Sequence, residues 1–289
     1  MDQAEELRNV IKKQNQRTKK PARIITVTSG KGGVGKSNIA VNLAVQFQRM
    51  GLKTIIFDAD IGLANVEVMF GTIPQYSLND LIYHDKEIED IITDGPEGFI
   101  SGGSGIMGLS NLTLDQISYL VKSVEKLSVI ADIVIVDTGA GISDSVMEFV
   151  ASSPEILLVT TPEPSSLTDA YSLLKMLYRN PKYDKNESVI HVLTNRVASF
   201  GEGKMVFDKL ESVVKQFLDG SVHYIGIIPQ DAMLEKAVRI QKPVSIVSPN
   251  ARSSKRFEEL AQYLVSGGKQ DSSEQNAFRQ FLTKLFNLS

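Results

Sequence analysis

The chain has 289 residues, of which 42% are hydrophobic, and a formal net charge of −3 at pH 7. This composition fits a globular protein with a core, and the weak negative charge argues against a surface that attracts nucleic acid or anionic membrane everywhere. The absence of cysteine excludes disulfides, thiolate metal sites and cysteine nucleophiles. No stretch is apolar for the roughly 20 residues of a spanning helix, and no signal-peptide core is present, so we expect a cytosolic protein.

Residues 1–20 read as a polar leader. Ala4, Leu7 and Ile11 fall on one helical face, but so short a segment does not form a stable helix by itself. Lysine and arginine dominate residues 12–20, with glutamine and asparagine between them. The composition leaves two interpretations open, a solvated disordered leader or a partner-binding segment on a basic tether.

The most specific functional motif in the sequence is a glycine-rich stretch at residues 30–37. It fits the phosphate-loop pattern, with an apolar strand predicted before it and a helix predicted after it, which a plain glycine-rich turn would not require. Backbone N–H groups and the helix N-terminus would bind phosphate oxygens. Lys36 would reach the β- and γ-phosphates, and the Ser37 hydroxyl would ligate Mg²⁺. The predicted ATP-binding residues of this loop are Gly30, Lys31, Gly32, Gly33, Val34, Gly35, Lys36 and Ser37.

From Pro21 onward the hydrophobic pattern alternates between strands and helices. Most strand candidates are continuous apolar runs, which is typical of parallel strands covered on both faces. The sequence therefore predicts a doubly wound, mostly parallel α/β sheet with helices on both faces, whose ligands bind at the carboxyl ends of the strands. Strands are predicted at 24–28, 54–58, 98–101, 133–137, 156–160, 189–194 and 222–228, and helices near 38–50, 114–127, 165–178, 204–217, 232–239 and 254–264.

Carboxylates follow two of these strands. Asp137 ends the fourth strand, which is the position of a carboxylate that holds Mg²⁺ directly or through water. Gly139 and Gly141 suit a backbone that rearranges around a γ-phosphate. Asp58 and Asp60 end the second strand, and for Asp60 the simpler alternative is that it caps the following loop. A second glycine-rich run, at 101–108, lacks the Gly-Lys-Ser ending and is interpreted as a flexible loop.

The C-terminal end is predicted to be an amphipathic helix behind a linker. Residues 265–273 have linker composition, and at about 100° per residue the apolar side chains of 276–288 occupy an arc of roughly 160°. The helix could lie in a membrane surface or dock on its own domain, because amphipathicity does not say what the apolar face meets. With two cations its membrane affinity would be weak and reversible. The candidate membrane residues are Phe278, Phe281, Leu282, Leu285 and Phe286.

Lys31 makes the loop resemble the deviant Walker A motif of the MinD/ParA ATPases, and the resemblance covers about residues 20–265. It implies an ATP-dependent homodimer in which Lys31 contacts the nucleotide of the partner subunit. Lys31, Lys36 and Asp60 would be the catalytic residues, with Asp60 orienting the attacking water. The metal site would comprise Ser37, Asp58 and Asp137.

The same resemblance places the base at the ends of the last two strands. Asn195 would hydrogen-bond the adenine, and Pro229, Gln230 and Asp231 would pack beside it. Ala198 stands where a guanine-specific site would carry an aspartate, so ATP is favoured over GTP.

The two ends of the chain indicate one subfamily within the MinD/ParA ATPases. The leader is similar to the Asp-Gln-Ala-x-x-Leu-Arg segment of the FlhG family of flagellar number regulators, also called YlxH or FleN. This implies that residues 1–20 stimulate the signal-recognition-type GTPase FlhF, that residues 267–289 target the inner face of the cell membrane, and that residues 21–266 are the ATPase domain. Basal-body components of the flagellum would be further partners. The matching leader residues are Asp2, Gln3, Ala4, Leu7 and Arg8.

We therefore expect an ATP-driven, membrane-associating switch that acts with FlhF on flagellar number and placement. One alternative is a partition ATPase of the ParA type that binds DNA non-specifically, against which the amphipathic tail and acidic balance count. Another is a small-molecule enzyme resembling dethiobiotin synthetase, but nothing outside the nucleotide motifs resembles a substrate pocket.

Overall fold

The computed structural model describes residues 21–60, 65–84, 86–93, 98–100, 113–267 and 274–286. The leader, the glycine-rich run at 101–108 and residues 268–273 of the predicted linker therefore lie outside the described residues, and so do the partner-binding positions predicted near the N-terminus. Residues 265–267, also predicted as linker, instead belong to the helix α11 (Arg252–Gly267). Everything below concerns the described part of the chain.

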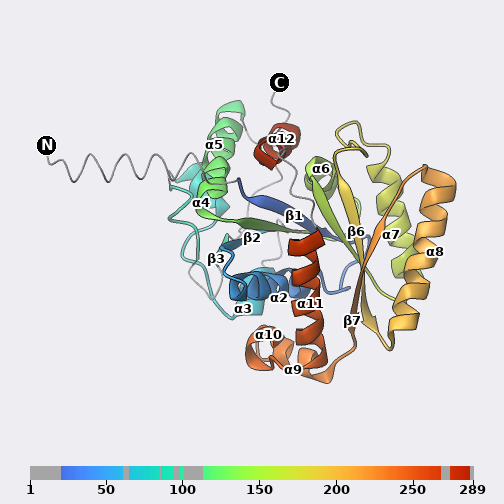
Figure 1. Cartoon of the computed structure of the whole chain (residues 1–289). Helices are drawn as coiled ribbons and strands as arrows, with labels where there is room; N and C mark the ends of the chain where they lie inside the picture. The colour runs from blue at the N-terminus through green and yellow to red at the C-terminus, as the bar shows by residue number, and fades with distance from the viewer. Residues whose placement is uncertain are drawn as a thin grey trace, which may run out of the picture.

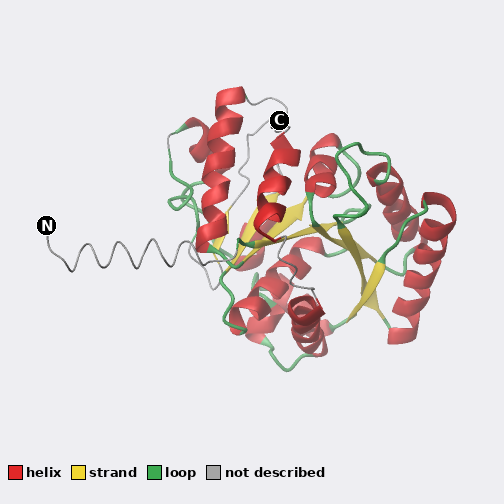
Figure 2. Cartoon of the chain, turned by 45° about the horizontal axis from the view of Figure 1, so that its top comes forward, coloured by secondary structure: helices red, strands yellow, loops and turns green. Residues whose placement is uncertain are grey.

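A seven-stranded sheet forms the centre of the protein, in the order β3-β2-β4-β1-β5-β6-β7 (Figures 1 and 2). Every strand pairing is parallel, which confirms the predicted fold class. Asp58 and Asp137 face each other in the β2–β4 register, so the two carboxylate motifs meet at the carboxyl edge. The strands are β1 (Arg23–Thr28), β2 (Thr54–Ala59), β3 (Gly98–Ile100), β4 (Ile133–Thr138), β5 (Glu155–Thr160), β6 (Val189–Val197) and β7 (His223–Pro229).

Helices cover both faces of the sheet (Figure 1). One face packs against α2 (Lys36–Arg49), α3 (Asn65–Phe70), α9 (Ala232–Arg239), α10 (Val244–Val247) and α11 (Arg252–Gly267). The other face packs against α4 (Leu78–Tyr83), α5 (Leu114–Ile130), α6 (Asp144–Ser152), α7 (Pro164–Leu177), α8 (Phe200–Leu218) and α12 (Glu274–Phe286).

Four of these helices, α3, α4, α6 and α10, were missed by the sequence reasoning. All are short, with nine residues or fewer, so their hydrophobic periodicity is weak. Helix α4 nevertheless carries a local signal, since Ser77 and Asp80 form a capping box at its start. A serine three residues ahead of an acidic side chain could have predicted that helix.

The C-terminal helix α12 is docked on the domain. Phe281, Leu282, Leu285 and Phe286 are 1–8% exposed and belong to the same apolar cluster as residues of β1, β2, β4 and α5. Helix α12 contacts α5, α6 and β1, and the Lys284 ammonium donates a hydrogen bond to the Glu187 carboxylate at 3.1 Å. The structure therefore corresponds to the docked alternative, in which these four candidate membrane residues are covered. The side chain of Phe278 lies outside the described residues.

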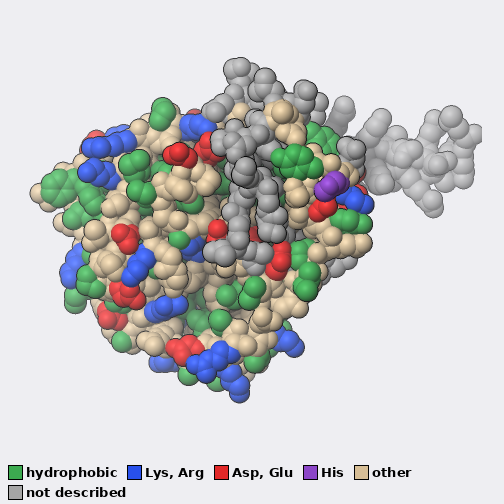
Figure 3. All heavy atoms as spheres, turned by 180° about the vertical axis from the view of Figure 1, so that it is seen from behind, with side chains coloured by type: hydrophobic (Ala, Val, Ile, Leu, Met, Phe, Trp, Pro, Cys, Tyr) green, Lys and Arg blue, Asp and Glu red, His purple; other side chains and the backbone are tan. Residues whose placement is uncertain are grey.

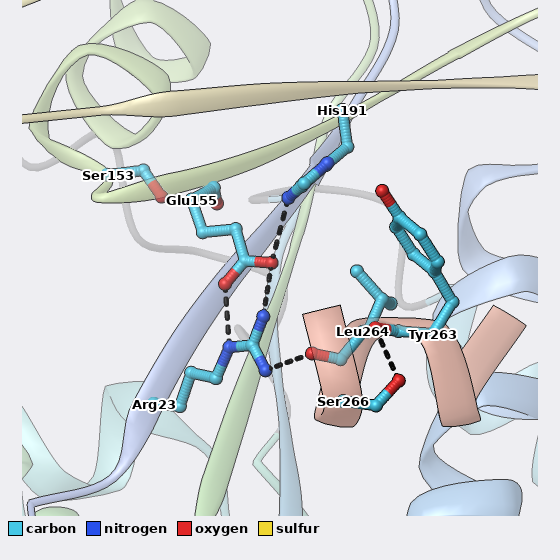
Figure 4. A network of polar contacts seen from close by, with 7 residues as sticks. All are labelled: Arg23, Ser153, Glu155, His191, Tyr263, Leu264 and Ser266. Carbon is cyan, nitrogen blue, oxygen red and sulfur yellow. Dashed lines mark hydrogen bonds and ion pairs between the residues drawn. The ribbon is translucent and has the colours of Figure 1, made fainter. Parts of the chain in front are cut away.

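A polar network joins the amino ends of three strands to the end of α11 (Figure 4). Arg23 donates to both carboxylate oxygens of Glu155, at 2.7 and 2.6 Å, and to the Leu264 carbonyl at 2.5 Å. His191 Nε2 lies 3.2 Å from the same carboxylate. Burial acts to raise the pKa of Glu155, but the bonds from His191 and Arg23 hold it below its usual value. The network fixes the end of the sheet opposite the nucleotide motifs.

No helix among the described residues is long and apolar enough to cross a membrane. On the part of the surface that Figure 3 shows, positive and negative side chains are interspersed. A mixed pattern of this kind agrees with the weak net charge of the whole chain.

Candidate nucleotide-binding site

The glycine-rich loop connects β1 to α2 at the carboxyl edge of the sheet. Gly33 and Gly35 have φ of +74° and +100°, a backbone region that glycine adopts without strain. Helix α2 begins at Lys36 after Gly35, and no side chain caps its first turn. Its first N–H groups are therefore available to an anion, as in a phosphate-binding loop. A Cβ atom on Gly30 would lie 2.1 Å from the Asp169 backbone, so the loop packs directly on α7.

A pocket of about 900 Å³ opens next to this loop. It brings together residues from four predicted motifs, which lie up to 199 positions apart in the chain. The sequence reasoning did not find the α3 and α9 side chains that line it, because they carry no nucleotide motif of their own. The predicted residues in the lining are Gly32, Gly33, Gly35, Lys36, Ser37, Asp60, Asn195, Pro229, Gln230 and Asp231, and those not predicted include Asn65, Met69, Leu234, Val238 and Arg239.

Asp137 has the surroundings expected of a magnesium ligand. Both of its carboxylate oxygens are fully buried and neither has a hydrogen-bond partner in the described part of the chain. Burial raises the pKa of Asp137 to about 7, against the opposing effects of the Ser37 hydroxyl and the Lys36 ammonium beside it. An unsatisfied buried carboxylate next to a hydroxyl fits a bound Mg²⁺, whose charge would hold Asp137 ionised.

Lys36 reaches into the same cluster. It is 8% exposed, and burial lowers its pKa while Asp137 and Asp60 act in the opposite direction. A buried ammonium facing two carboxylates is in place to meet the phosphates of a nucleotide.

Asp58, another predicted metal ligand, has backbone N–H groups bonded to both of its carboxylate oxygens. One of its oxygens accepts the Asp60 N–H at 3.1 Å, and the other accepts the Val66 N–H at 3.2 Å. Burial and the nearby Asp137 raise the pKa of Asp58 to about 8. Asp58 therefore bonds to the backbone at Asp60 and at Val66, and its place at the metal site stays a prediction.

Asp60 projects into the pocket beside Gly139. Its Oδ2 accepts a hydrogen bond from Asn65 Nδ2 at 2.8 Å, and its Oδ1 would lie 3.2 Å from a Cβ atom placed on Gly139. Burial raises the pKa of Asp60, although the Lys36 charge and the Asn65 bond both oppose this. The alternative of a plain loop cap does not describe this side chain, because its hydrogen-bond partner is an amide side chain five residues ahead and it faces the pocket.

Lys31 makes contacts within its own chain. Its ammonium donates to Glu163 and to Ser165, both at 2.7 Å, at the start of α7. The hydrogen bond and the charge of Lys31 hold the pKa of Glu163 below its usual value. In this position the Lys31 ammonium does not line the pocket of its own chain. It would have to leave Glu163 before it could reach the pocket of a partner subunit.

Two predicted base-binding residues already have backbone partners. Asn195 Nδ2 donates to the Val34 carbonyl at 2.7 Å, so it links β6 to the phosphate loop. The Asp231 carboxylate accepts from the N–H groups of Met233 and Ser253, each at 2.9 Å, and thereby caps both α9 and α11. Asp231 therefore holds the starts of α9 and α11, and Gln230 and side chains of α9 line the pocket beside it.

Comparison with known proteins agrees with this geometry. The family described as ParA, NUBPL iron-transfer P-loop NTPase, matches residues 20–265. The chain belongs to this family. The absence of cysteine means that the iron transfer in the family's description has no thiolate ligands to use here.

Curated relatives of this ParA-family ATPase include flagellar proteins. The antiactivator FleN of Pseudomonas aeruginosa is 40% identical over 85% of this chain and 87% of its own length. The flagellum site-determining protein YlxH of Helicobacter pylori is 34% identical over 92% and 90%. The solved structure of the septum site-determining protein MinD from Pyrococcus horikoshii, complexed with Mg-ADP, covers 87% of this chain and 99% of its own, with a TM-score of 0.67 and 23% identity. At 23% identity this likeness shows a shared fold, and the family match identifies the chain as a P-loop NTPase.

Proposed function

We propose that this ATPase is an ATP-dependent, dimerising switch that regulates the number and placement of flagella. The observation that carries the proposal is the combination of Lys31 in the phosphate loop with 40% identity to FleN over most of the chain. Lys31 in the phosphate loop supports ATP hydrolysis at a dimer. The flagellar relatives support a role in the control of flagella. A DNA-partition role has no comparable support in the described surface.

We assign a separate role in ATP hydrolysis to each group of residues in the pocket. Lys36 and the first-turn amides of α2 hold the phosphates, while Ser37 and Asp137 hold Mg²⁺, which supplies positive charge to the phosphate oxygens. Asp60 orients the attacking water next to Gly139. Lys31, released from Glu163, adds a cation in the partner's site where the transition state gains negative charge.

The C-terminal helix gives this switch a route to the membrane. The apolar side chains of α12 are buried against α5 and α6, so membrane binding requires α12 to leave the domain. A dimer presents two such helices together, and the second one binds at high effective concentration, so a weak interaction becomes adequate.

The leader is proposed to act on FlhF. A peptide of residues 1–23 should raise the GTPase rate of FlhF by itself, because Gln3 and Arg8 have the side chains to reach phosphates or a catalytic water across an interface. The matched control is the same peptide with both of these residues changed to alanine, which should not stimulate. An unmodified peptide without effect at saturating concentration would refute the partnership through the isolated leader.

Flagellar control is tested in Pseudomonas aeruginosa cells that lack FleN. Expression of this chain should restore the wild-type number of flagella per cell, counted by electron microscopy, whereas Lys36→Ala at equal expression should not. Restoration by both proteins would show that flagellar control does not need the nucleotide switch. Restoration by neither, with FleN itself active in the same cells, would contradict the proposed role in flagellar control.

A further inference from the structure

We propose that Asn65 is a positioning residue for ATP hydrolysis: its side-chain amide fixes one oxygen of the Asp60 carboxylate so that the other oxygen faces the attacking water. The inference rests on the proposed role of Asp60 and extends it to a residue that carries no nucleotide-binding motif.

The Asp60 carboxylate is constrained differently on its two oxygens. Oδ2 receives the Asn65 Nδ2–H at 2.8 Å, whereas Oδ1 lies against Gly139, with 3.2 Å to the position of a Cβ atom there. Gly139 lacks a side chain, so nothing at that position shields Oδ1 from the pocket. Oδ2 is thus fixed by a hydrogen bond, and Oδ1 is open to the pocket. A carboxylate that orients a water molecule requires this arrangement.

Asn65 is itself held firmly. It is the first residue of α3, and the next N–H group, that of Val66, donates to the buried Asp58 carboxylate at 3.2 Å. Val66 is fully buried, and α3 packs on α2, the helix that begins at Lys36. The position of the Asn65 amide is therefore tied to the helix that carries the phosphate-binding lysine.

The type of side chain at 65 also matters. A carboxamide is a neutral donor, so it orients the carboxylate without supplying a second positive charge. Lys36 already provides the cation near Asp60. A lysine or arginine at 65 would form an ion pair that competes with the water for the carboxylate, and an aliphatic residue would leave Asp60 free to rotate.

The test compares Asn65→Leu with the wild-type chain in single-turnover ATP hydrolysis and in nucleotide binding. We expect the hydrolysis rate to fall about 10- to 100-fold, the effect of an ångström-scale misplacement, with nucleotide affinity unchanged. The variant should also accumulate as an ATP-bound dimer. Asn180→Leu is the matched control, since it removes a remote Asn180 Oδ1 bond to the Lys182 N–H at 2.9 Å and should leave hydrolysis unchanged.

A double-mutant cycle separates positioning from a general structural role. If Asn65 acts through Asp60, Asn65→Leu should have no further effect on hydrolysis in an Asp60→Asn background. An equal loss in both backgrounds, or a loss of nucleotide affinity in step with the rate, would overturn the inference. Asn65→Ser, whose hydroxyl is too short to reach Asp60, repeats the test should the leucine variant fail to fold.

Two variants distinguish the positioning role of Asn65 from the proposed role of Asp60 on which it rests. Wild-type hydrolysis by Asp60→Ala would remove the proposed role of Asp60 itself. Slow hydrolysis by Asp60→Ala combined with normal hydrolysis by Asn65→Leu would leave that role intact and refute the positioning by Asn65 alone.

Discussion

Replacing Leu282 by alanine should release α12 from the domain without unfolding the rest of the protein. Leu282 is 1% exposed and belongs to the apolar cluster between α12 and the sheet. Truncating a leucine this deeply buried costs about 2–5 kcal/mol, and each 1.4 kcal/mol is a factor of ten in an equilibrium constant. The undocked population should therefore rise by about 30-fold or more.

Hydrogen–deuterium exchange with mass spectrometry measures this directly. In Leu282→Ala, amides of residues 274–286 should exchange about 30-fold faster or more, while those of α2 and β1 keep their protection. Leu210→Ala is the control, because Leu210 is equally buried but lies in the cluster under α8. It should lower the melting temperature and leave α12 protected. A melting temperature lowered by Leu282→Ala with unchanged α12 exchange would show that α12 unfolds only with the whole domain, which would refute a releasable helix.

Three further predictions concern the pocket. Lys36→Ala should weaken ATP binding at least about 10-fold in calorimetry, because it removes the buried cation that meets the phosphates; unchanged affinity would contradict this. Asp60→Ala should retain ATP and accumulate as a dimer in light scattering with slow single-turnover hydrolysis, and wild-type turnover would rule out its role. Because the pKa values of Asp58 and Asp137 are raised to about 8 and about 7, the folded protein binds protons that the unfolded chain has lost above pH 4. Without Mg²⁺ the melting temperature should thus fall as the pH rises from 5 to 8, and less so in Asp137→Asn; a rise over that range would contradict the raised pKa values.

The sequence predicted the features of this site that depend on local order along the chain. A parallel sheet brings the ends of its strands to one edge, so a glycine loop after β1 and carboxylates after β2 and β4 had to meet there. The pairing of Asp58 with Asp137 across β2 and β4 is the result. Sequence order also carried the family resemblance, which the family match over residues 20–265 confirms.

The remaining features depend on tertiary contacts that no local pattern encodes. Lys31 meets Glu163, 132 positions away, because the phosphate loop packs on α7 at Gly30. The face of α12 was visible in the sequence, but the groove that covers it is built from α5, α6 and β1. The caps formed by Asp231 were hidden for the same reason, since its second partner, Ser253, lies 22 residues further on.

The central claim is that ATP closes two copies of this chain into a dimer that Lys31 completes. Light scattering coupled to size exclusion, with the wild type and Lys31→Ala in Mg-ATP and in Mg-ADP, tests it most directly. The account predicts a mass of two chains for the wild type in ATP only, and a monomer for Lys31→Ala in both nucleotides despite retained ATP binding. A wild-type monomer in ATP, or a Lys31→Ala dimer equal to that of the wild type, would contradict it.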